Sequence, residues 1–295
     1  MKLKHFKILY ENFGFGIAFP AFFASRFKSA ALLKRERILA YLKTKYSSII
    51  STHNYTTNTQ EHITDSYAIW TLWWQGKDEV PEVVKACFDS MNNNRGKHSL
   101  IILDKNNFRD YIDFPEHVMK KFSMNAISIT HLSELIREYL LSRYGGLWLD
   151  STVFVAKEIP EEIFQMKYFT IKRPINTHSR FISQGLWTSA VQASEKGNIM
   201  SNFIYDFLIE YLKNENCFID YFLIDYVIKI ALEELQECQK IFDEIPINNP
   251  NVMALHELLN SKWDEERYEQ LKKDTYLFKL AWRTNYKNLD RIREK

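Results

Sequence analysis

Asp150 is the residue best placed for chemistry in this chain. Apolar residues recur every three or four positions between 131 and 144, which predicts an amphipathic helix that ends at Gly145-Gly146. The apolar residues 147–149 predict a short strand that delivers Asp150 to its C-terminal end. Ligands of open α/β sheets bind just beyond the carboxyl ends of strands. We therefore expect Asp150 to face a ligand rather than to serve as an ordinary turn residue.

Glu134 and Arg137 are charged residues of the same predicted helix, and their spacing makes them neighbours on its flank. An exposed pair of this kind stabilises an isolated helix by only ~0.2–0.5 kcal/mol, so structure alone gives little reason for it. Two interpretations stay open. The pair is an ordinary surface ion pair, or its side chains contact a ligand beside Asp150.

A second candidate segment runs from Tyr67 to Gly76 and ends in tryptophans. Its apolar residues predict a buried strand, which is followed by Trp73, Trp74 and Gln75. A flat indole beside a glycine suits a stacked nucleotide base and a close approach of the backbone. Tryptophans taken singly more often belong to the core, so either role is open for these two.

These segments resemble sugar-nucleotide glycosyltransferases of the GT-A fold. Residues 144–152, YGGLWLDST, are similar to a family segment of two glycines, an aromatic residue and two aspartates. The closer similarity is to the capsular polysaccharide synthesis proteins, relatives of a group of mannosyltransferases and of the clostridial toxin glucosyltransferases. The first aspartate falls on Asp150 and the second on Thr152, with Trp148 at the aromatic position. The resemblance runs from about 69 to 283.

The resemblance also assigns residues to a nucleotide-sugar donor. Glu134 and Arg137 stand where relatives carry an Asp and an Arg that hold the donor sugar. Lys279, Trp282 and Arg283 match a C-terminal segment whose cation and indole close over the diphosphate. The implied fold is a GT-A-like, Rossmann-type α/β domain with a mainly parallel central sheet, a helical N-terminal segment and helical C-terminal additions.

Further candidates lie in the second half of the chain. Residues 219–225 are similar to another family segment, in which Asp225 or Asp220 would point at the acceptor hydroxyl or the donor. A helix cap for Asp220 and a polar-face acid for Asp225 are equally open. Gln184 would place its amide near the reacting carbon.

The resemblance implies a divalent metal, Mn²⁺ or Mg²⁺, as cofactor. A hard cation bound to a diphosphate takes only one or two protein carboxylates plus waters. Asp150 can therefore suffice, with Thr152 positioning a metal-bound water. His256 is a candidate second ligand, although a lone histidine more often has a structural role.

The implied activity is transfer of a hexosyl residue from a UDP-sugar to a surface or capsular polysaccharide, with retention of configuration. The metal, Lys279 and Arg283 would stabilise the leaving diphosphate. The alternative is a relative that binds nucleotide sugars or carbohydrate without turnover, because Thr152 replaces a motif acid. A phosphotransferase or nuclease is weaker, since two-metal sites usually need several convergent carboxylates.

The composition suits one large α/β domain with a basic extension. The chain has 295 residues, of which 46% are hydrophobic and 26% charged, with a net charge of +2. Residues 1–50 hold ten Lys or Arg and two Glu, so the remainder is acidic and no nucleic-acid partner is expected. The three cysteines lack disulfide or zinc spacing, which fits a reducing compartment.

Three regions are predicted: a basic helical segment at 1–50, a polar linker at 51–66 and the glycosyltransferase domain at 67–295. The first contains a helix at 30–46 in which Lys and Arg alternate with Leu and Ile. That composition is typical of an interfacial helix, so residues 1–46 are expected to contact an anionic membrane, where a lipid-linked glycan acceptor would lie. The alternative is a helical hairpin packed on the domain.

The apolar run 13–24 resembles a short signal peptide, but its glycines and proline and the basic residues after it argue against cleavage. A UDP-sugar donor is made in the cytoplasm, so the protein is expected there, peripheral at the inner face of the cell membrane. In the domain, strands and helices in alternation predict a doubly wound sheet. Strands are expected at 67–74, 99–103, 168–171 and 185–190, and helices from Pro81, at 199–213 and at 219–242.

Overall fold

The structure is a computed structural model that describes residues 3–55, 68–179 and 181–293. Five strands form the central sheet: β1 (Ala68–Leu72), β2 (Ser99–Leu103), β3 (Gly146–Leu149), β5 (Tyr168–Thr170) and β6 (Val191–Ser194). Their order is β2-β1-β3-β6-β5. β1 pairs in parallel with β2 and β3, whereas β6 is antiparallel to β3 and β5. Only β6 therefore runs against the others, which confirms the mainly parallel sheet.

A second, two-stranded sheet joins the end of β3 to the C-terminal part of the chain. β4 (Val153–Val155) pairs antiparallel with β7 (Leu277–Lys279), and Val153 stands opposite Lys279. β4 begins shortly after Asp150, so this pairing fixes residue 279 beside it despite the long separation in sequence. The small sheet is the element that assembles the site.

The double glycine allows β3 to lie against β1. Gly145 and Gly146 have φ angles of +70° and +98°, a region that favours glycine. A Cβ atom on Gly146 would lie 2.3 Å from the carbonyl oxygen of Ala68. No side chain fits there, so the two glycines are required by backbone packing as well as by the turn.

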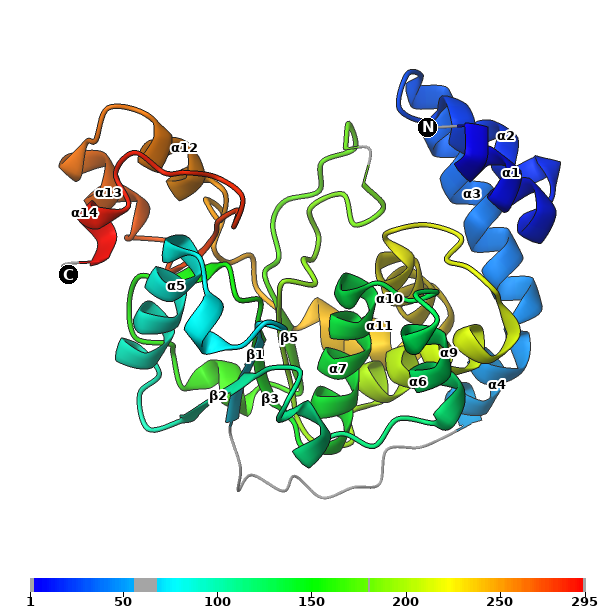
Figure 1. Ribbon diagram of the computed structural model, residues 1–295, viewed down its shortest axis with the longest axis horizontal. Coiled ribbons are helices and arrows are strands. Elements are labelled where there is room, and N and C mark those ends of the chain that lie inside the picture. Colours follow the sequence, from blue (N-terminus) through cyan, green and yellow to red (C-terminus); the bar gives the residue numbers. More distant parts are fainter. Residues whose placement is uncertain (1–2, 56–67, 180, 294–295) are drawn as a thin grey trace.

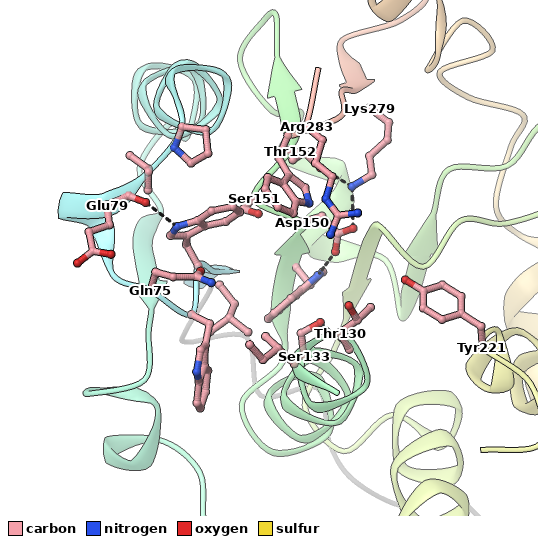
Figure 2. Close-up of a pocket in the computed structure, with 18 residues that line it drawn as sticks. Gln75, Glu79, Thr130, Ser133, Asp150, Ser151, Thr152, Tyr221, Lys279 and Arg283 are labelled. Carbon is pink, nitrogen blue, oxygen red and sulfur yellow. Dashed lines mark hydrogen bonds and ion pairs between the residues drawn. The ribbon is translucent and has the colours of Figure 1, made fainter. Parts of the chain in front are cut away.

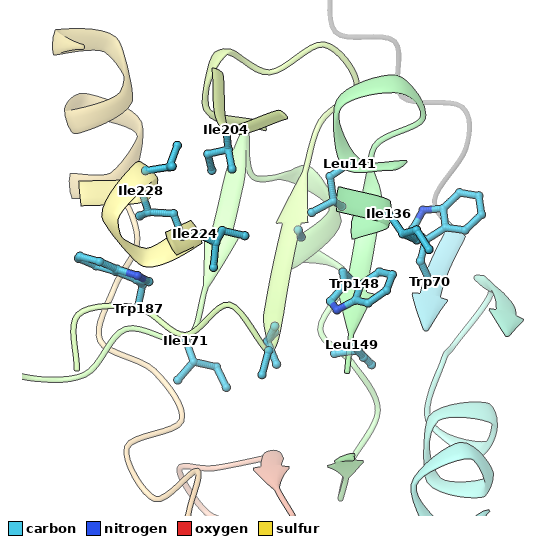
Figure 3. Packing of buried hydrophobic residues seen from close by; sticks show 14 of the residues in the cluster. Trp70, Ile136, Leu141, Trp148, Leu149, Ile171, Trp187, Ile204, Ile224 and Ile228 are labelled. Carbon is cyan, nitrogen blue, oxygen red and sulfur yellow. The ribbon is translucent and has the colours of Figure 1, made fainter. Parts of the chain in front are cut away.

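Helices cover both sides of the sheet (Figure 1). α5 (Glu82–Asn93) lies to one side, and α7 (Ile129–Arg143), α9 (Ile199–Asn214) and α10 (Leu223–Glu234) lie to the other. The periodic apolar residues of α7 are buried against α9 and the strands, as their spacing predicted. Figure 3 shows Ile136 of α7 between Trp70 of β1 and Trp148 of β3. Burial of each such side chain contributes about 1.5–3 kcal/mol.

Four helices precede the domain: α1 (Leu3–Phe13), α2 (Phe15–Phe23), α3 (Lys28–Lys45) and α4 (Ser47–Tyr55). α3 confirms the helix predicted at 30–46. The predicted linker is wrong for residues 51–55, which are helical in α4 because Ile50 and the preceding Tyr46 are buried and α4 packs on α9. The rest of that linker lies outside the described residues.

Two element predictions are wrong. The strand expected at 185–190 is a loop, because positive φ angles at Gln184 and Gly185 turn the chain, and the strand β6 follows it. The helix expected at 219–242 is two helices, α10 and α11 (Gln236–Asp243), separated at the extended residue Leu235. No Pro or Gly marks that break, so the apolar pattern alone could not show it.

The remaining helical segments are short. Among the described residues, no helix is long and apolar enough to cross a membrane. The other helical segments are η1 (Lys77–Glu79), η2 (Phe108–Asp110), α6 (Glu116–Ser123), α8 (Glu162–Gln165), α12 (Ala254–Asn260), α13 (Glu265–Leu271) and α14 (Asp290–Arg293).

Candidate active site

A cleft of about 830 Å³ opens where β1 and β3 end (Figure 2). This is the carboxyl edge of the parallel strands, where the sequence predicted a ligand, and the volume suits a nucleotide-sized molecule. Its walls come from the segments after β1 and β3, from the start of α7 and from the chain after β7. The lining residues are Leu72, Trp73, Trp74, Gln75, Glu79, Val80, Pro81, Ile129, Thr130, Ser133, Trp148, Asp150, Ser151, Thr152, Tyr221, Lys279, Trp282 and Arg283.

Asp150 lies in the wall of this cleft with both carboxylate oxygens bound. Oδ2 accepts a hydrogen bond of 2.9 Å from Lys279 Nζ, and Oδ1 accepts one of 3.0 Å from Trp148 Nε1. Arg137 Nη1 lies 3.8 Å from Oδ1. Burial opposes ionisation, but the charges of Lys279 and Arg137 outweigh it and lower the pKa of Asp150. The carboxylate is therefore a fixed negative charge at neutral pH.

Lys279 links the two positions of the family's acidic motif. Its ammonium also donates to Thr152 Oγ1, so it bridges Asp150 and the residue that replaces the second aspartate. Thr152 is buried, whereas about a quarter of the Lys279 side chain stays exposed to the cleft. Figure 2 shows Arg283 on the same side of the cleft as Lys279. Two cations thus face the position expected for a diphosphate.

Arg137 lies behind Asp150 and is buried, which rules out the surface ion-pair interpretation. Its Nε donates to Glu138 Oε1 at 3.1 Å, and its guanidinium carbon lies 5.8 Å from the Trp148 ring centroid. Its Nη2 has no hydrogen-bond partner among the described residues. A buried donor of this kind costs about 1–3 kcal/mol if it is left unpaired. The pattern is typical of a site that a polar ligand completes.

Glu134 and Glu138 are buried acids on the same helix as Arg137. Burial raises the pKa of Glu134 to about 8 against the charge of Arg137, and the carboxylates of Asp225 and Asp150 add to the rise. Burial likewise raises the pKa of Glu138 to about 7 against Arg137. Glu138 was not predicted, although an acid on the apolar face of an amphipathic helix was a signal that could have found it.

The aromatic wall is formed by Trp73, Trp74 and Trp282. Trp73 donates from Nε1 to the backbone oxygen of Glu79 at 3.2 Å and lies edge to face with Trp282, 5.8 Å between centroids. Arg283 lies 4.5 Å from the Trp282 ring centroid. Trp74 packs on two phenylalanines yet also lines the cleft, together with Gln75. Gly76 does not line it.

Besides Gly76, Glu134 and Arg137, three further predicted site residues lie outside the cleft lining. Asp225 is buried behind it, accepts a 2.8 Å hydrogen bond from Trp187 Nε1 and has a pKa that burial raises to about 6. Gln184 lies in the loop before β6. His256 Nδ1 lies 2.6 Å from the hydroxyl of Tyr286. The structure therefore does not bring Gln184 or His256 to Asp150.

Asp220 has the capping role, one of the two roles that the sequence left open for it, and the next residue, Tyr221, faces the cleft. Asp220 accepts from the backbone N–H of Phe222 at 2.9 Å and forms an ion pair with Lys34, so it stabilises the turn before α10. Tyr221 is 56% exposed and lines the cleft. It was not predicted, because an isolated tyrosine before a helix carries no distinguishing pattern.

The residues do not fit a divalent metal as they stand. Both oxygens of Asp150 and the hydroxyl of Thr152 already accept hydrogen bonds, two of the three from the same ammonium. The third predicted ligand, His256, lies outside the cleft lining. Across residues 3–55, 68–179 and 181–293, no group of three or more His, Cys, Asp or Glu side chains could hold a metal ion. The ammonium group of Lys279 stands where the resemblance places the divalent metal ion.

The chain matches a family model described as capsular polysaccharide synthesis protein over residues 21–295. The chain belongs to this family. The match confirms the resemblance found in the sequence and supports an enzyme that transfers glycosyl groups in general. No curated protein matches the chain.

Two solved glycosyltransferase structures are similar at low identity. "PaToxG Glycosyltransferase" is 11% identical with a TM-score of 0.37, over 89% of this chain and 98% of that one. The apo-form glycosyltransferase GlyE of Streptococcus pneumoniae TIGR4 is 12% identical with a TM-score of 0.34, over 61% of this chain and 52% of that one. Neither likeness bears on the donor or the acceptor of this family member.

Proposed function

We propose that this capsular polysaccharide synthesis protein transfers a hexosyl residue from a nucleotide sugar, a UDP-sugar, to a polysaccharide acceptor. The observation that carries the proposal is the cleft at the carboxyl edge of the sheet, which joins an aromatic wall to Lys279, Arg283 and Asp150. The aromatic wall suits a nucleotide base, and the cations suit a diphosphate. This combination of contacts matches a sugar nucleotide in chemistry and in size.

The leaving diphosphate gains negative charge as the glycosidic bond breaks, so fixed cations lower the barrier. We assign this role to Lys279 and Arg283, while Asp150 orients the ammonium through its 2.9 Å hydrogen bond. Arg137 Nη2, which has no hydrogen-bond partner within the described part of the chain, provides a further donor behind them. Retention of configuration remains part of the proposal by family resemblance.

The acceptor is proposed to approach past Tyr221. This side chain contacts Phe222 at 5.0 Å between centroids, and Phe222 contacts Phe181 at 5.3 Å. All three rings are exposed, and they lead from the cleft to α3, where Arg35 donates to the backbone oxygen of Phe181. Flat exposed rings suit the apolar faces of sugars. With a lipid-linked glycan acceptor, the enzyme would act at the cytoplasmic face of the membrane.

The donor proposal is tested with UDP, GDP and dTDP, with and without a chelator, by thermal unfolding and by UDP release from UDP-sugars. Saturation with UDP at 100 times its dissociation constant should add ~2.7 kcal/mol of stability. Because Lys279 occupies the expected metal position, we expect this gain to persist with EDTA and to fall in Lys279→Met. No stabilisation by any nucleotide would contradict the proposal. UDP binding without UDP release would favour the non-catalytic alternative.

The acceptor proposal is tested with Tyr221→Ala. The variant should keep UDP release to water, because the cation pair and the aromatic wall are unchanged, and should lose most of the transfer to membrane-extracted acceptor. Ile247→Ala, which removes an exposed apolar residue (59%) outside the cleft lining, is the matched control. Equal transfer by both variants would place the acceptor elsewhere.

A further inference from the structure

Four phenylalanines form a continuous aromatic stripe on the N-terminal helices. Phe15, Phe19, Phe23 and Phe27 are four residues apart, and successive rings lie 5.0, 5.2 and 6.2 Å from each other. The first three belong to α2, whose opposite side, with Ile17 and Ala18, is buried. The last begins α3. α2 is therefore apolar on both its buried and its outer side, which is unusual for a helix that meets only water.

The stripe is exposed and lies at the outer end of the molecule. Phe15, Phe19 and Phe27 are 58%, 46% and 57% exposed. Seven of the 17 large hydrophobic residues exposed among those described lie between Leu3 and Leu33, so this surface is concentrated and not scattered. Figure 1 shows α1 and α2 at the end of an arm, which α3 connects to α4 and the domain.

Basic side chains lie on the same arm as the stripe. Between residues 3 and 33 the chain carries Lys4, Lys7, Arg26 and Lys28 against the single acid Glu11. All four basic residues are exposed, and Arg26 and Lys28 flank Phe27 directly. Exposed aromatic rings bordered by cations match the interface of an anionic bilayer, where rings lie at the acyl boundary and cations contact headgroups.

We propose that the aromatic stripe inserts into the interface of an anionic membrane, and that Lys4, Lys7, Arg26 and Lys28 bind its headgroups. The arm then acts as a monotopic anchor, because α2 has only nine residues and cannot span a bilayer. The inference deepens the proposed function, since it holds the cleft beside a lipid-linked acceptor. It is testable without any donor or acceptor.

The experiment is flotation of the full-length protein with phosphatidylcholine vesicles, with and without phosphatidylglycerol, at low and high salt. Wild type should float with the anionic vesicles and less so as salt rises. A triple variant should bind the vesicles more weakly by roughly tenfold for each ring removed. Its substitutions are Phe15→Ser, Phe19→Ser and Phe27→Ser. A second triple variant should bind the vesicles more weakly by about fivefold for each charge removed. Its substitutions are Lys4→Gln, Lys7→Gln and Arg26→Gln.

The matched control is Met124→Ser/Ile247→Ser, which removes two residues of similar exposure, 68% and 59%, outside the arm. It should float like wild type. Melting temperature and UDP binding of each variant separate loss of folding or of donor binding from loss of membrane binding. No flotation of wild type, or equal flotation of the phenylalanine variant, overturns the inference. A wild-type dimer that the phenylalanine variant converts to a monomer, without flotation, would instead make the stripe a contact between two copies.

Discussion

The carboxylate of Asp150 contacts both Lys279, which faces the cleft, and Arg137, which is buried behind it. Asp150→Asn keeps the shape but removes the charge that holds Lys279 and Arg137 in place. We expect UDP release to fall about 100-fold, the order seen when a fixed electrostatic contact is lost. Kinetics with melting temperature as the folding control would measure this.

Thr152→Ala is the comparison for that variant. It removes one acceptor of the Lys279 ammonium and leaves the ion pair with Asp150, so the loss of activity should be milder. Near-normal UDP release by Asp150→Asn, at every metal concentration and with EDTA, would show that the active site lies elsewhere.

Glu134 makes stability depend on pH. Burial raises its pKa to about 8, so the folded state holds a proton that the unfolded state releases near its ordinary pKa. This contribution to stability is complete below the pKa that Glu134 has in the unfolded chain. It is lost as the pH rises through the pKa that Glu134 has in the folded protein. Stability should therefore decline between about pH 5 and pH 8. Glu134→Gln should make that decline shallower in urea unfolding, while the buried acids Glu138 and Asp225 retain their share of it. An unchanged profile would mean that Glu134 is ionised in the folded protein.

At the scale of elements, the double glycine holds β3 against β1. Gly146→Ala places a Cβ 2.3 Å from the Ala68 carbonyl oxygen at a φ of +98°. We expect the free energy of unfolding to fall by about 1–3 kcal/mol from backbone strain, and by more because the clash must also be relieved. Urea denaturation would measure it.

Gly16→Ala is the matched control for this element. Gly16 lies within α2, and nothing would lie within 4 Å of its new Cβ. Alanine should therefore stabilise the helix by roughly 0.5–1 kcal/mol. Equal effects of the two substitutions would contradict the packing argument.

At the scale of the whole molecule, the arm divides into an outer part and a part that supports the domain. Tyr41, Lys45 and Tyr46 all contact the buried carboxylate of Glu215. Deleting residues 1–46 would leave that carboxylate buried without these partners and should destabilise the domain by several kcal/mol. Deleting residues 1–27 removes only α1, α2 and the N-cap of α3. We expect the shorter deletion to keep UDP release and lose vesicle binding, and loss of both would show that the outer part is also structural.

The chain itself determined the elements on which the site is built. Residues 131–152 encode an amphipathic helix, a glycine turn and a strand that ends in an acid, and each signal is local because it depends on spacing and on backbone freedom. The same reasoning located the tryptophans after β1, whereas Lys279 in β7 and Arg283 beyond it were assigned through the family resemblance. Local patterns could not reveal the break at Leu235, where no glycine or proline interrupts the apolar spacing.

Tertiary structure alone decided which residues meet. The pairing of β4 with β7 brings Lys279 to Asp150 and Thr152, and it leaves His256 with Tyr286. Burial of Glu134, Arg137 and Glu138 is likewise a property of the packed helices, and it is what raises the pKa values of the two glutamates. Spacing along a chain sets the direction of a side chain, whereas its charge partners come from distant segments that only the folded core holds in register.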